Sequence, residues 1–337
     1  MPLPRIAIAL GDPAGIGPEI ALKAALHPEV LGLCVPVLVG DRGALQLHAA
    51  ACGLAPQIIG VEPEQVRDFQ LPEGAVALIE RRQLVPGQLK LGQVDAAHGR
   101  AILDSAAAAI NCAMAGQVDA VVAAPQTELA VKQAGVRFDG YPTFVAAVTG
   151  VPREDAYLML CFDEVRIVHT TLHVSVRQAL AMITAERVEG AIRAADKALR
   201  RLGVAAPRIA VSGLNPHAGE DGLFGVEEAT IIAPAIARLK AAGLDLEGPY
   251  GADIILAKKG FDAYVMMLHD QGHILAKALA PNRAAGITIG TPVLFSSVAH
   301  GSALDIAGKN QARPDAVIEA IRRLARVSTP RALTAAA

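Results

Sequence analysis

The regular alternation of short apolar runs with helical patterns constrains the fold of this chain more than any other feature. Runs that fit buried strands recur along the sequence. Ala-rich amphipathic segments such as 99–116 and 186–203 lie between them. This order is typical of α/β proteins, in which helices connect and cover mainly parallel strands. The candidate strands are residues 5–10, 35–39, 75–79, 119–123, 157–160, 165–170, 208–213, 263–268 and 286–289.

The composition fits such helix-covered sheets. Hydrophobic residues make up 53% of the 337 residues, yet only 3% are aromatic and none is Trp, so Ala, Val, Leu and Ile must build the core. The length suits two domains or lobes, and since no Gly/Ser-rich linker divides the chain we expect the lobes to be interwoven. A net charge of −2, without a basic stripe or an aromatic platform, argues against a nucleic-acid partner.

Cysteine usage and hydropathy predict a cytoplasmic protein that does not bind membranes. The four cysteines form no C-x-x-C pair, which disfavours a disulfide framework or a cysteine zinc site and fits a reducing compartment. No apolar run reaches the ~18 residues that span a bilayer. We see no charged segment with a cleavage site before the first strand.

A glycine-rich turn, GDPAGIGPE (11–19), follows the first candidate strand. Pro18 and Glu19 suit the first turn of a helix, and the glycines permit a ligand to approach the backbone closely. However, the spacing G-x-x-x-G-x-G, with Pro13 inside, departs from the G-x-G-x-x-G of dinucleotide-binding Rossmann folds. Asp41, after VLVG, lies late for the acidic residue of such folds. The stretch predicts a ligand-binding turn, with an ordinary α/β turn as the alternative.

Three stretches deliver histidines at the exits of candidate strands: VRIVHTTLHVSV, RIAVSGLNPHAGEDG and YVMMLHDQGHILAK. Imidazole is the commonest zinc ligand, and a catalytic site takes three protein ligands. His169 and His173 would lie ~13 Å apart on a strand, so only one of them can join a metal site. His173, at the strand exit, is the better placed, whereas His169 is expected to pack in the sheet. One interpretation is a metal that His173 shares with His217 and His269. The alternative for each histidine is a hydrogen-bonded structural residue.

Other residues near these histidines could complete an active site. Asp253 and Asp270 could orient ligands or hold substrate hydroxyls. Lys277 could act as an acid/base or bind a carboxylate, and a solvated surface lysine is an equal alternative. His273 could approach a substrate or close a turn. The small-residue loop SSVAHGSALDIAG (296–308) offers serine hydroxyls and backbone N–H groups that could hold a pyrophosphate.

Taken together, GDPAGIGPE, TLHVSV, GLNPHAGE, HDQGH and HGSALDIAG resemble the 4-hydroxythreonine-4-phosphate dehydrogenase (PdxA-like) family, over residues 8 to 308. The resemblance implies a two-lobed α/β/α fold of the isocitrate/isopropylmalate dehydrogenase-like type, with an active-site cleft between the lobes. It also implies a homodimer and NAD bound without a Rossmann fingerprint, with NADP left open. We expect one lobe at 1–135 plus 275–330, a second at 136–274 that carries most metal ligands, and a disordered tail at 331–337.

The same resemblance assigns roles to individual residues. The implied metal ligands are His173, His217 and His269; imidazole suits zinc, while substrate oxygens would also suit magnesium, manganese or iron. The implied catalytic residues are Lys277, Asp270 and Asp253, with proton transfer assigned to the first two. The expected substrate contacts are Tyr141, Thr143, His273 and Phe295. The expected NAD contacts are Gly11, Asp12, Gly15, Ser297, His300, Gly301 and Asp305.

Three departures from the family's pattern point to a different substrate. The chain has Gly140-Tyr141-Pro142-Thr143 where the phosphothreonine enzymes have Gly-His-Thr. Gly286 replaces an Asn, and Phe295 stands where they have an Arg. Losing a His, an Asn and an Arg removes anion ligands that a phosphate site needs. The profile resembles the branch that oxidises terephthalate cis-dihydrodiol, 1,2-dihydroxy-3,5-cyclohexadiene-1,4-dicarboxylate.

The sequence therefore predicts metal- and NAD-dependent oxidative decarboxylation of a β-hydroxy acid, with the dihydrodiol giving protocatechuate, CO2 and NADH. One alternative within the family is the oxidation of 4-hydroxythreonine-4-phosphate in pyridoxal phosphate synthesis, or of a related phosphorylated sugar acid. A second is a three-histidine metal lyase or hydrolase that needs no nicotinamide. A third is a metabolite-binding protein without turnover.

Overall fold

The structure, a computed structural model, describes residues 3–85, 87–280 and 284–325. The chain divides into two compact units, residues 1–149 with 292–337 (unit 1) and residues 150–291 (unit 2). The sequence-based expectation placed the borders at 135/136 and 274/275, and the predicted tail at 331–337 lies outside the described residues. Among the helices of the described ranges, none is both long and apolar enough to cross a membrane.

Unit 1 contains strands in the order β3-β4-β2-β1-β5-β12, and neighbouring strands run parallel. Successive residues of the inner strands are buried, because helices cover both faces of a parallel sheet. The bounds are β1 (Arg5–Ala9), β2 (Val35–Gly40), β3 (Gln57–Gly60), β4 (Ala75–Glu80), β5 (Ala120–Ala123) and β12 (Phe295–Val298).

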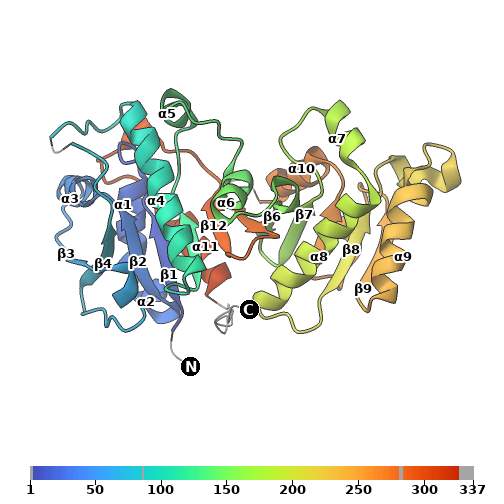
Figure 1. Cartoon of the computed structure of the whole chain (residues 1–337), viewed down its shortest axis with the longest axis horizontal. Coiled ribbons are helices and arrows are strands. Elements are labelled where there is room, and N and C mark those ends of the chain that lie inside the picture. The colour runs from blue at the N-terminus through green and yellow to red at the C-terminus, as the bar shows by residue number, and fades with distance from the viewer. Residues whose placement is uncertain (1–2, 86, 281–283, 326–337) are drawn as a thin grey trace. The chain divides into compact units, whose positions relative to one another are not determined.

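Two helical layers enclose these strands (Figure 1). One layer is α4 (Ala96–Met114), which contacts β1, β2 and β5 and on which α5 (Glu128–Gln133) and α6 (Tyr141–Thr149) pack. Ala106, Ala109 and Ile110 of α4 share a core cluster with Ala7, Val37 and Val121 of the strands. The other layer comprises α1 (Gly17–Ala25), α2 (Pro28–Leu33), α3 (Arg42–Ala51) and α11 (Asp315–Leu324).

Unit 2 contains strands in the order β11-β6-β7-β10-β8-β9. Only residues 163–164 connect β6 to β7, with Asp163 at φ 44°, and such a short connection reverses the chain, so β6 is antiparallel to β7. β6 is also antiparallel to β11, whereas β7, β10, β8 and β9 run parallel. The bounds are β6 (Tyr157–Phe162), β7 (Val165–His169), β8 (Arg208–Ser212), β9 (Asp245–Tyr250), β10 (Ala263–Met266) and β11 (Ala285–Ile289).

Helices also cover both faces of the unit 2 strands. α8 (Ala185–Arg201) packs on β6, β7, β10 and β11, and α9 (Ala233–Ala241) packs beside it on β9 (Figure 1). α10 (His269–Leu279) packs against the other face, where Ala276 and Ala280 join Ile167 and Met266 in one cluster. α7 (Val176–Met182) leads into α8. Single helical turns occur at Pro63–Gln65, Arg153–Asp155, Glu228–Ile232, Ile255–Ala257 and Leu304–Ile306, and the coiled loop Pro216–Gly222 has left-handed backbone angles.

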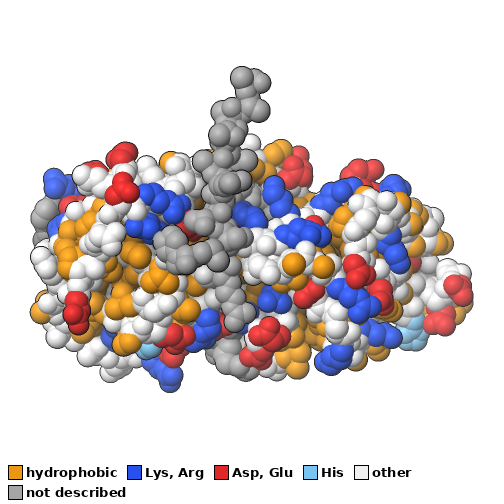
Figure 2. All heavy atoms as spheres, turned by 90° about the horizontal axis from the view of Figure 1, so that it is seen from below, with side chains coloured by type: hydrophobic (Ala, Val, Ile, Leu, Met, Phe, Trp, Pro, Cys, Tyr) orange, Lys and Arg blue, Asp and Glu red, His pale blue; other side chains and the backbone are white. Residues whose placement is uncertain are grey.

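The predicted strands and the α/β class are confirmed, and the two named amphipathic segments form α4 and α8. The sequence pattern missed β3, β9 and β12. β3 and β9 lie at the ends of the strand order. No residue of β3 and only Leu246 of β9 (DLEGPY) is buried, so neither shows a buried apolar run. β12 (FSSV) is short and half serine. On the face shown in Figure 2, basic, acidic and apolar side chains are intermixed.

Candidate active site

The carboxyl ends of β7, β10 and β8 lie side by side in unit 2, because β10 pairs in parallel with both neighbours. Gln271 joins two of these ends. Its Oε1 accepts hydrogen bonds from the N–H groups of Met267 and Leu268, each at 3.0 Å, and its Nε2 donates to the Gly213 carbonyl at 3.2 Å. Thr171, beyond the end of β7, joins the third strand end, because its Oγ1 donates to the Met267 carbonyl at 2.8 Å. Open α/β sheets bind ligands at such an edge.

Four histidines gather at this edge. His269 and His273, one turn apart on α10, stack with ring centroids 3.7 Å apart and planes 12° apart. The ring of His173, beyond the end of β7, lies 5.5 Å from that of His269. His169, the last residue of β7, is fully buried, as predicted, and its Nε2 lies 3.1 Å from Nδ1 of His273. The fold therefore brings His169 and His273 into contact with each other and places both rings near His269.

Burial keeps two of these rings neutral. It lowers the pKa of His169 to about 3, and the neighbouring His273 adds to this effect. Burial likewise lowers the pKa of His273 to about 4, with a further contribution from His269. A neutral imidazole has one donor and one acceptor nitrogen. Near pH 7 the hydrogen bond between these rings therefore joins a donor to an acceptor.

His217 follows β8, but its side chain turns toward its own loop. Its Nδ1 lies 3.1 Å from Glu220 Oε2, and its ring meets Phe224 edge-on at 5.7 Å between centroids. Residues 217–221 all have positive φ, from 44° to 84°, a conformation that costs about 1–3 kcal/mol for each non-glycine residue. Such strain is found where surrounding contacts hold a segment for function.

Glu228, which the sequence analysis missed, anchors this strained loop. Its Oε1 accepts from the N–H groups of Leu214 and Asn215 at 2.7 and 2.8 Å. Burial acts to raise the pKa of Glu228, but the hydrogen bonds from Asn215 and Leu214 outweigh it and hold the pKa below the usual range. The loop, Glu228 and Pro249 border a cavity of about 450 Å³. A buried glutamate 11 residues after His217 has no local pattern that would single it out.

The chemistry of two predicted metal ligands fits a metal. Nδ1 of His269 lies 2.7 Å from Asp270 Oδ1, as Nδ1 of His217 lies near Glu220. Metal-bound histidines commonly donate their second N–H to a carboxylate, which leaves Nε2 for the ion. The geometry does not yet fit: within the ranges that the structure describes, no three His, Cys, Asp or Glu side chains form a group that could hold a metal ion. The set His173, His217 and His269 stays a prediction.

Lys277 lies on the same face of α10 as His269 and His273, because the three are spaced four residues apart. Lys277 is exposed. The spacing of four residues becomes a sequence signal for the site only when a helix is recognised as starting at His269. Asp253 is also exposed, and it lies near His217: a Cβ built on Gly251 would sit 2.7 Å from Asp253 Oδ1 and 3.7 Å from His217 Cα.

In unit 1 the glycine-rich turn meets the small-residue loop at 300–305. Ile16 N–H donates to the Ser302 carbonyl at 2.8 Å, and Thr127 Oγ1 donates to Ser302 Oγ at 2.9 Å. A Cβ at Gly15 would lie 2.6 Å from Ser302 Cβ, and one at Gly11 would lie 2.3 Å from the Pro125 carbonyl oxygen. These close approaches require glycine. The fold thus brings together the two segments predicted to hold the cofactor.

Asp12 offers this turn a polar group suited to a ligand. Its carboxylate is fully buried, and Oδ1 accepts from Ala14 N–H at 2.9 Å. Among the described residues Oδ2 has no hydrogen-bond partner, a costly arrangement that a ligand donor would relieve. Ser297, at the end of β12, and His300 are half-buried, whereas Gly301 and Asp305 are exposed. Their contacts with NAD remain predictions.

Three predicted substrate residues lie in unit 1. Tyr141 and Phe295 pack together with ring centroids 4.7 Å apart in the core cluster that also contains Val145. Burial raises the pKa of Tyr141, whose hydroxyl has no partner among the described residues. Phe295 is fully buried, so its ring can shape a site only through its neighbours. Thr143 Oγ1 donates to the Gly140 carbonyl at 3.0 Å and fixes the start of α6.

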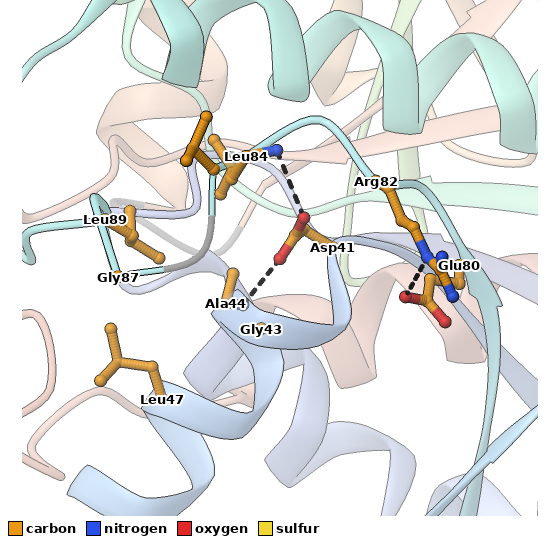
Figure 3. A pocket seen from close by; sticks show the side chains of 10 residues that line it. Asp41, Gly43, Ala44, Leu47, Glu80, Arg82, Leu84, Gly87 and Leu89 are labelled. Carbon is orange, nitrogen blue, oxygen red and sulfur yellow. Dashed lines mark hydrogen bonds and ion pairs between the residues drawn. The ribbon is translucent and has the colours of Figure 1, made fainter.

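A cavity of about 670 Å³ lies at the carboxyl ends of β2 and β4 (Figure 3). Leu47, Leu84 and Leu89 line it beside the Glu80–Arg82 ion pair. Asp41 accepts from Ala44 N–H at 2.9 Å and from Leu84 N–H at 3.4 Å, and so ties the start of α3 to the loop beyond β4. The cavity has the size of a small-molecule site. Asp41, considered above only as the acidic residue of a Rossmann fold, caps the start of α3.

Comparison with known proteins identifies the family. Residues 32–324 match the family described as pyridoxal phosphate biosynthetic protein PdxA. The chain belongs to the PdxA family. It is 42% identical to the 1,2-dihydroxy-3,5-cyclohexadiene-1,4-dicarboxylate dehydrogenase of Comamonas sp, over 95% of this chain and 96% of that one. It is 38% identical to the D-threonate 4-phosphate dehydrogenase of Cupriavidus necator, over 98% of this chain and 99% of that one.

Solved structures agree with this PdxA-family assignment. A 4-hydroxythreonine-4-phosphate dehydrogenase from Burkholderia phymatum superposes with a TM-score of 0.86 at 34% identity, covering 98% of this chain and 99% of that one. A terephthalate 1,2-cis-dihydrodiol dehydrogenase from Burkholderia xenovorans LB400 gives 0.72 at 40% identity, covering 96% and 98%. The predicted family, the PdxA-type fold and the assignment as a dehydrogenase are confirmed.

Proposed function

We propose that this PdxA-family protein oxidises terephthalate cis-dihydrodiol with NAD and a divalent metal, giving protocatechuate, CO2 and NADH. The observation that carries the proposal is the 42% identity with a dihydrodiol dehydrogenase over 95% of the chain. Relatives named for phosphorylated substrates share between 34% and 41%, so identity alone does not separate the two substrate classes. Tyr141, Gly286 and Phe295, which stand where those enzymes carry phosphate-binding side chains, support the same choice.

Two groups of residues would hold NAD and the metal. The turn at 11–15 and residues 297–305 would hold NAD, whose nicotinamide accepts the hydride. His173, His217 and His269 would hold the divalent metal, be it zinc, magnesium, manganese or iron, which supplies Lewis-acid polarisation of hydroxyl oxygens when bound. The unpartnered Asp12 oxygen supports a ligand at the turn, and the His269–Asp270 pair supports a metal at the histidines.

Side chains on and beside α10 would move the protons. Oxidation takes a hydride from the ring C–H and a proton from the hydroxyl on the same carbon, and Lys277 is the proposed proton acceptor. The β-keto acid then loses CO2, and the proton returns to the enolate oxygen as the ring becomes aromatic. Asp270 assists by holding His269, and Asp253, beside His217, would bind a hydroxyl group.

The aromatic residues of unit 1 would shape the substrate pocket. Tyr141 and Phe295 form a rigid apolar pair, and Thr143 fixes the loop before α6. His273 would contact a substrate hydroxyl from α10. Because both rings are buried, they would act through the neighbours that they position. Two uncharged side chains at these positions suit a cyclohexadiene ring better than a phosphate group, because a phosphate requires charged donors.

The first experiment measures NADH formation by the metal-loaded protein, with the dihydrodiol and 4-phosphohydroxythreonine offered in parallel and with NAD and NADP compared. Turnover of the diol alone supports the proposal. Turnover of the phosphate ester alone would replace it with the family alternative, which the TM-score of 0.86 to a hydroxythreonine-phosphate enzyme favours. Lys277→Met should abolish turnover, while Lys197→Met, at an exposed position on α8, should not.

Two further outcomes would change the proposal. Activity that needs the metal but no nicotinamide would indicate a three-histidine lyase or hydrolase instead. Ligand-induced stabilisation without turnover of any substrate would indicate a metabolite-binding protein. We also propose a homodimer, which sedimentation equilibrium tests independently of activity.

A further inference from the structure

A short hydrogen-bonded chain connects the unit 2 sheet to the histidine face of α10. The Leu158 carbonyl of β6 lies 3.4 Å from His169 Nδ1, because the two residues oppose each other in adjacent antiparallel strands. His169 Nε2 lies 3.1 Å from His273 Nδ1. His169 is 104 residues from His273 in the sequence, so only the fold brings them together.

The carbonyl of Leu158 fixes which atoms donate and which accept in this series of hydrogen bonds. A carbonyl oxygen only accepts, so His169 Nδ1 must carry the proton that it donates to Leu158. His169 is neutral because of its burial, so its Nε2 bears a lone pair and accepts. His273 Nδ1 must then be the donor. The hydrogen bond made by one ring nitrogen decides the state of the other, so Nε2 of His273 is left as an acceptor.

We propose that His169 is a positioning residue that holds His273 in its Nδ1–H tautomer, so that Nε2 of His273 accepts a hydrogen bond from a substrate hydroxyl. The second half of this inference rests on the proposed function, because the dihydrodiol and 4-phosphohydroxythreonine both carry a hydroxyl at the carbon to be oxidised. Accepting that hydrogen bond orients the hydroxyl without taking its proton, which leaves proton removal to Lys277.

Packing holds both rings in place. On one side, His273 stacks on His269 at 3.7 Å. On the other, Gly272 leaves the space that the His169 ring occupies, since a Cβ there would lie 2.3 Å from His169 Nε2 and 2.7 Å from Ile167 Cγ2. The half-buried His273 therefore has little freedom to exchange its hydrogen-bond partner.

Nitrogen-15 NMR of histidine-labelled full-length protein at pH 7.5 tests the tautomer directly. The His273 signals are assigned with His273→Gln. In the wild type we expect Nδ1 of His273 to show the protonated shift and Nε2 the unprotonated shift. The reverse pattern would overturn the inference. The wild-type spectrum decides this without substrate, metal or any variant of His169.

Two substitutions of His169 then test the positioning role. His169→Phe removes the acceptor, and His273 should become a mixture of tautomers. His169→Gln keeps an acceptor oxygen near the position of Nε2 and should restore the Nδ1–H form. His98→Phe, which removes a buried histidine of α4 that faces the Gln93 carbonyl at 3.1 Å, is the matched control and should leave the His273 signals unchanged.

Kinetics test the contact with the substrate. With the diol, kcat/KM should fall about five- to tenfold in His169→Phe, as for the loss of one hydrogen bond, and recover in His169→Gln. An unchanged kcat/KM in His169→Phe, with tautomers mixed, would overturn the substrate contact. Failure of the wild type to turn over any offered substrate would overturn the proposed function and leave the tautomer assignment standing.

Discussion

Different kinds of contact hold the strand ends of unit 1 and those of unit 2. In unit 1 the turn after β1 and the loop after β12 meet through backbone groups, as between Ile16 and Ser302. In unit 2 the ends of β7, β10 and β8 are joined by side chains, above all Gln271. Backbone amides and small residues suit close binding of a cofactor, whereas side chains supply groups that ligate and transfer protons. Under the proposed function, the first region would bind the cofactor, and the second would hold the metal and transfer protons.

Glycine marks both regions, for different reasons. A Cβ at Gly17 would lie 2.1 Å from the Leu10 carbonyl oxygen, which belongs to the backbone at the end of β1. A Cβ at Gly272 would lie 2.3 Å from His169 Nε2, which belongs to a side chain. The backbone that follows a strand cannot shift without moving the strand, whereas the His169 ring can be displaced at the expense of its hydrogen bonds. Replacing each glycine with alanine should therefore have a different effect on the free energy of unfolding.

The largest expected effect is on Gly17. Gly17→Ala should lower the free energy of unfolding by about 3 kcal/mol or more, because strand and turn must separate. Gly272→Ala should cost less, since alanine favours the helix by about 1 kcal/mol, but it should displace His169. Urea denaturation compares the variants, and NMR of the histidines reports the displacement. Equal urea midpoints would contradict the distinction between backbone and side-chain contacts.

The next effect concerns metal affinity in unit 2. Asp270→Asn should weaken binding of a divalent metal about 10- to 100-fold, because His269 loses the carboxylate that orients its ring. Glu220→Gln should do the same through His217. Competition with a chromogenic chelator measures both. Asp245→Asn, at an exposed aspartate of β9, is the control. Affinity that survives both substitutions would mean that these carboxylates do not orient metal ligands.

The two units should also differ in acid sensitivity. The pKa of His169 is lowered by burial to about 3, from 6.5. Below pH 6.5 the unfolded chain binds a proton that the folded chain refuses, so stability falls until about pH 3, by at most about 1.4 kcal/mol per pH unit. Burial lowers the pKa of His48 in unit 1 in the same direction, although the Pro13 carbonyl and Glu19 oppose it.

Urea midpoints between pH 7.5 and 4.5 measure this dependence. His169→Gln should reduce the fall of the urea midpoint at acid pH more than His48→Gln does, because fewer groups oppose the effect of burial on the pKa of His169. If the urea midpoint of His169→Gln falls with pH as steeply as that of the wild type, other groups cause the acid sensitivity.

The smallest expected effect is at the cavity of unit 1. Asp41→Ala should lower the free energy of unfolding by about 1 kcal/mol, because α3 loses its N-cap and the loop beyond β4 loses an anchor. Asp41→Asn keeps an acceptor oxygen for Ala44 N–H and should stay near the wild type. If Asn behaves like Ala, the negative charge rather than the cap stabilises this corner.

Local pattern by itself determined most of the framework of this protein and pointed to its candidate histidines. Apolar runs such as those of β1 and β7 are visible in the sequence because burial of consecutive residues leaves a local signature. His173, His217 and His269 were identified because each follows such a run. The family motifs added the PdxA assignment, which the comparisons confirm. The departures at Tyr141, Gly286 and Phe295 were also visible in the sequence.

Only the tertiary structure decided which of these residues meet. The order of strands placed His169 against His273 and Ser302 against Gly15, over separations that no local pattern encodes. The tertiary structure also shows that one oxygen of Asp12 is buried and that His217 faces Glu220. The physical reason is that burial periodicity is a property of neighbouring residues, whereas a hydrogen bond between distant side chains depends on how strands and helices pack.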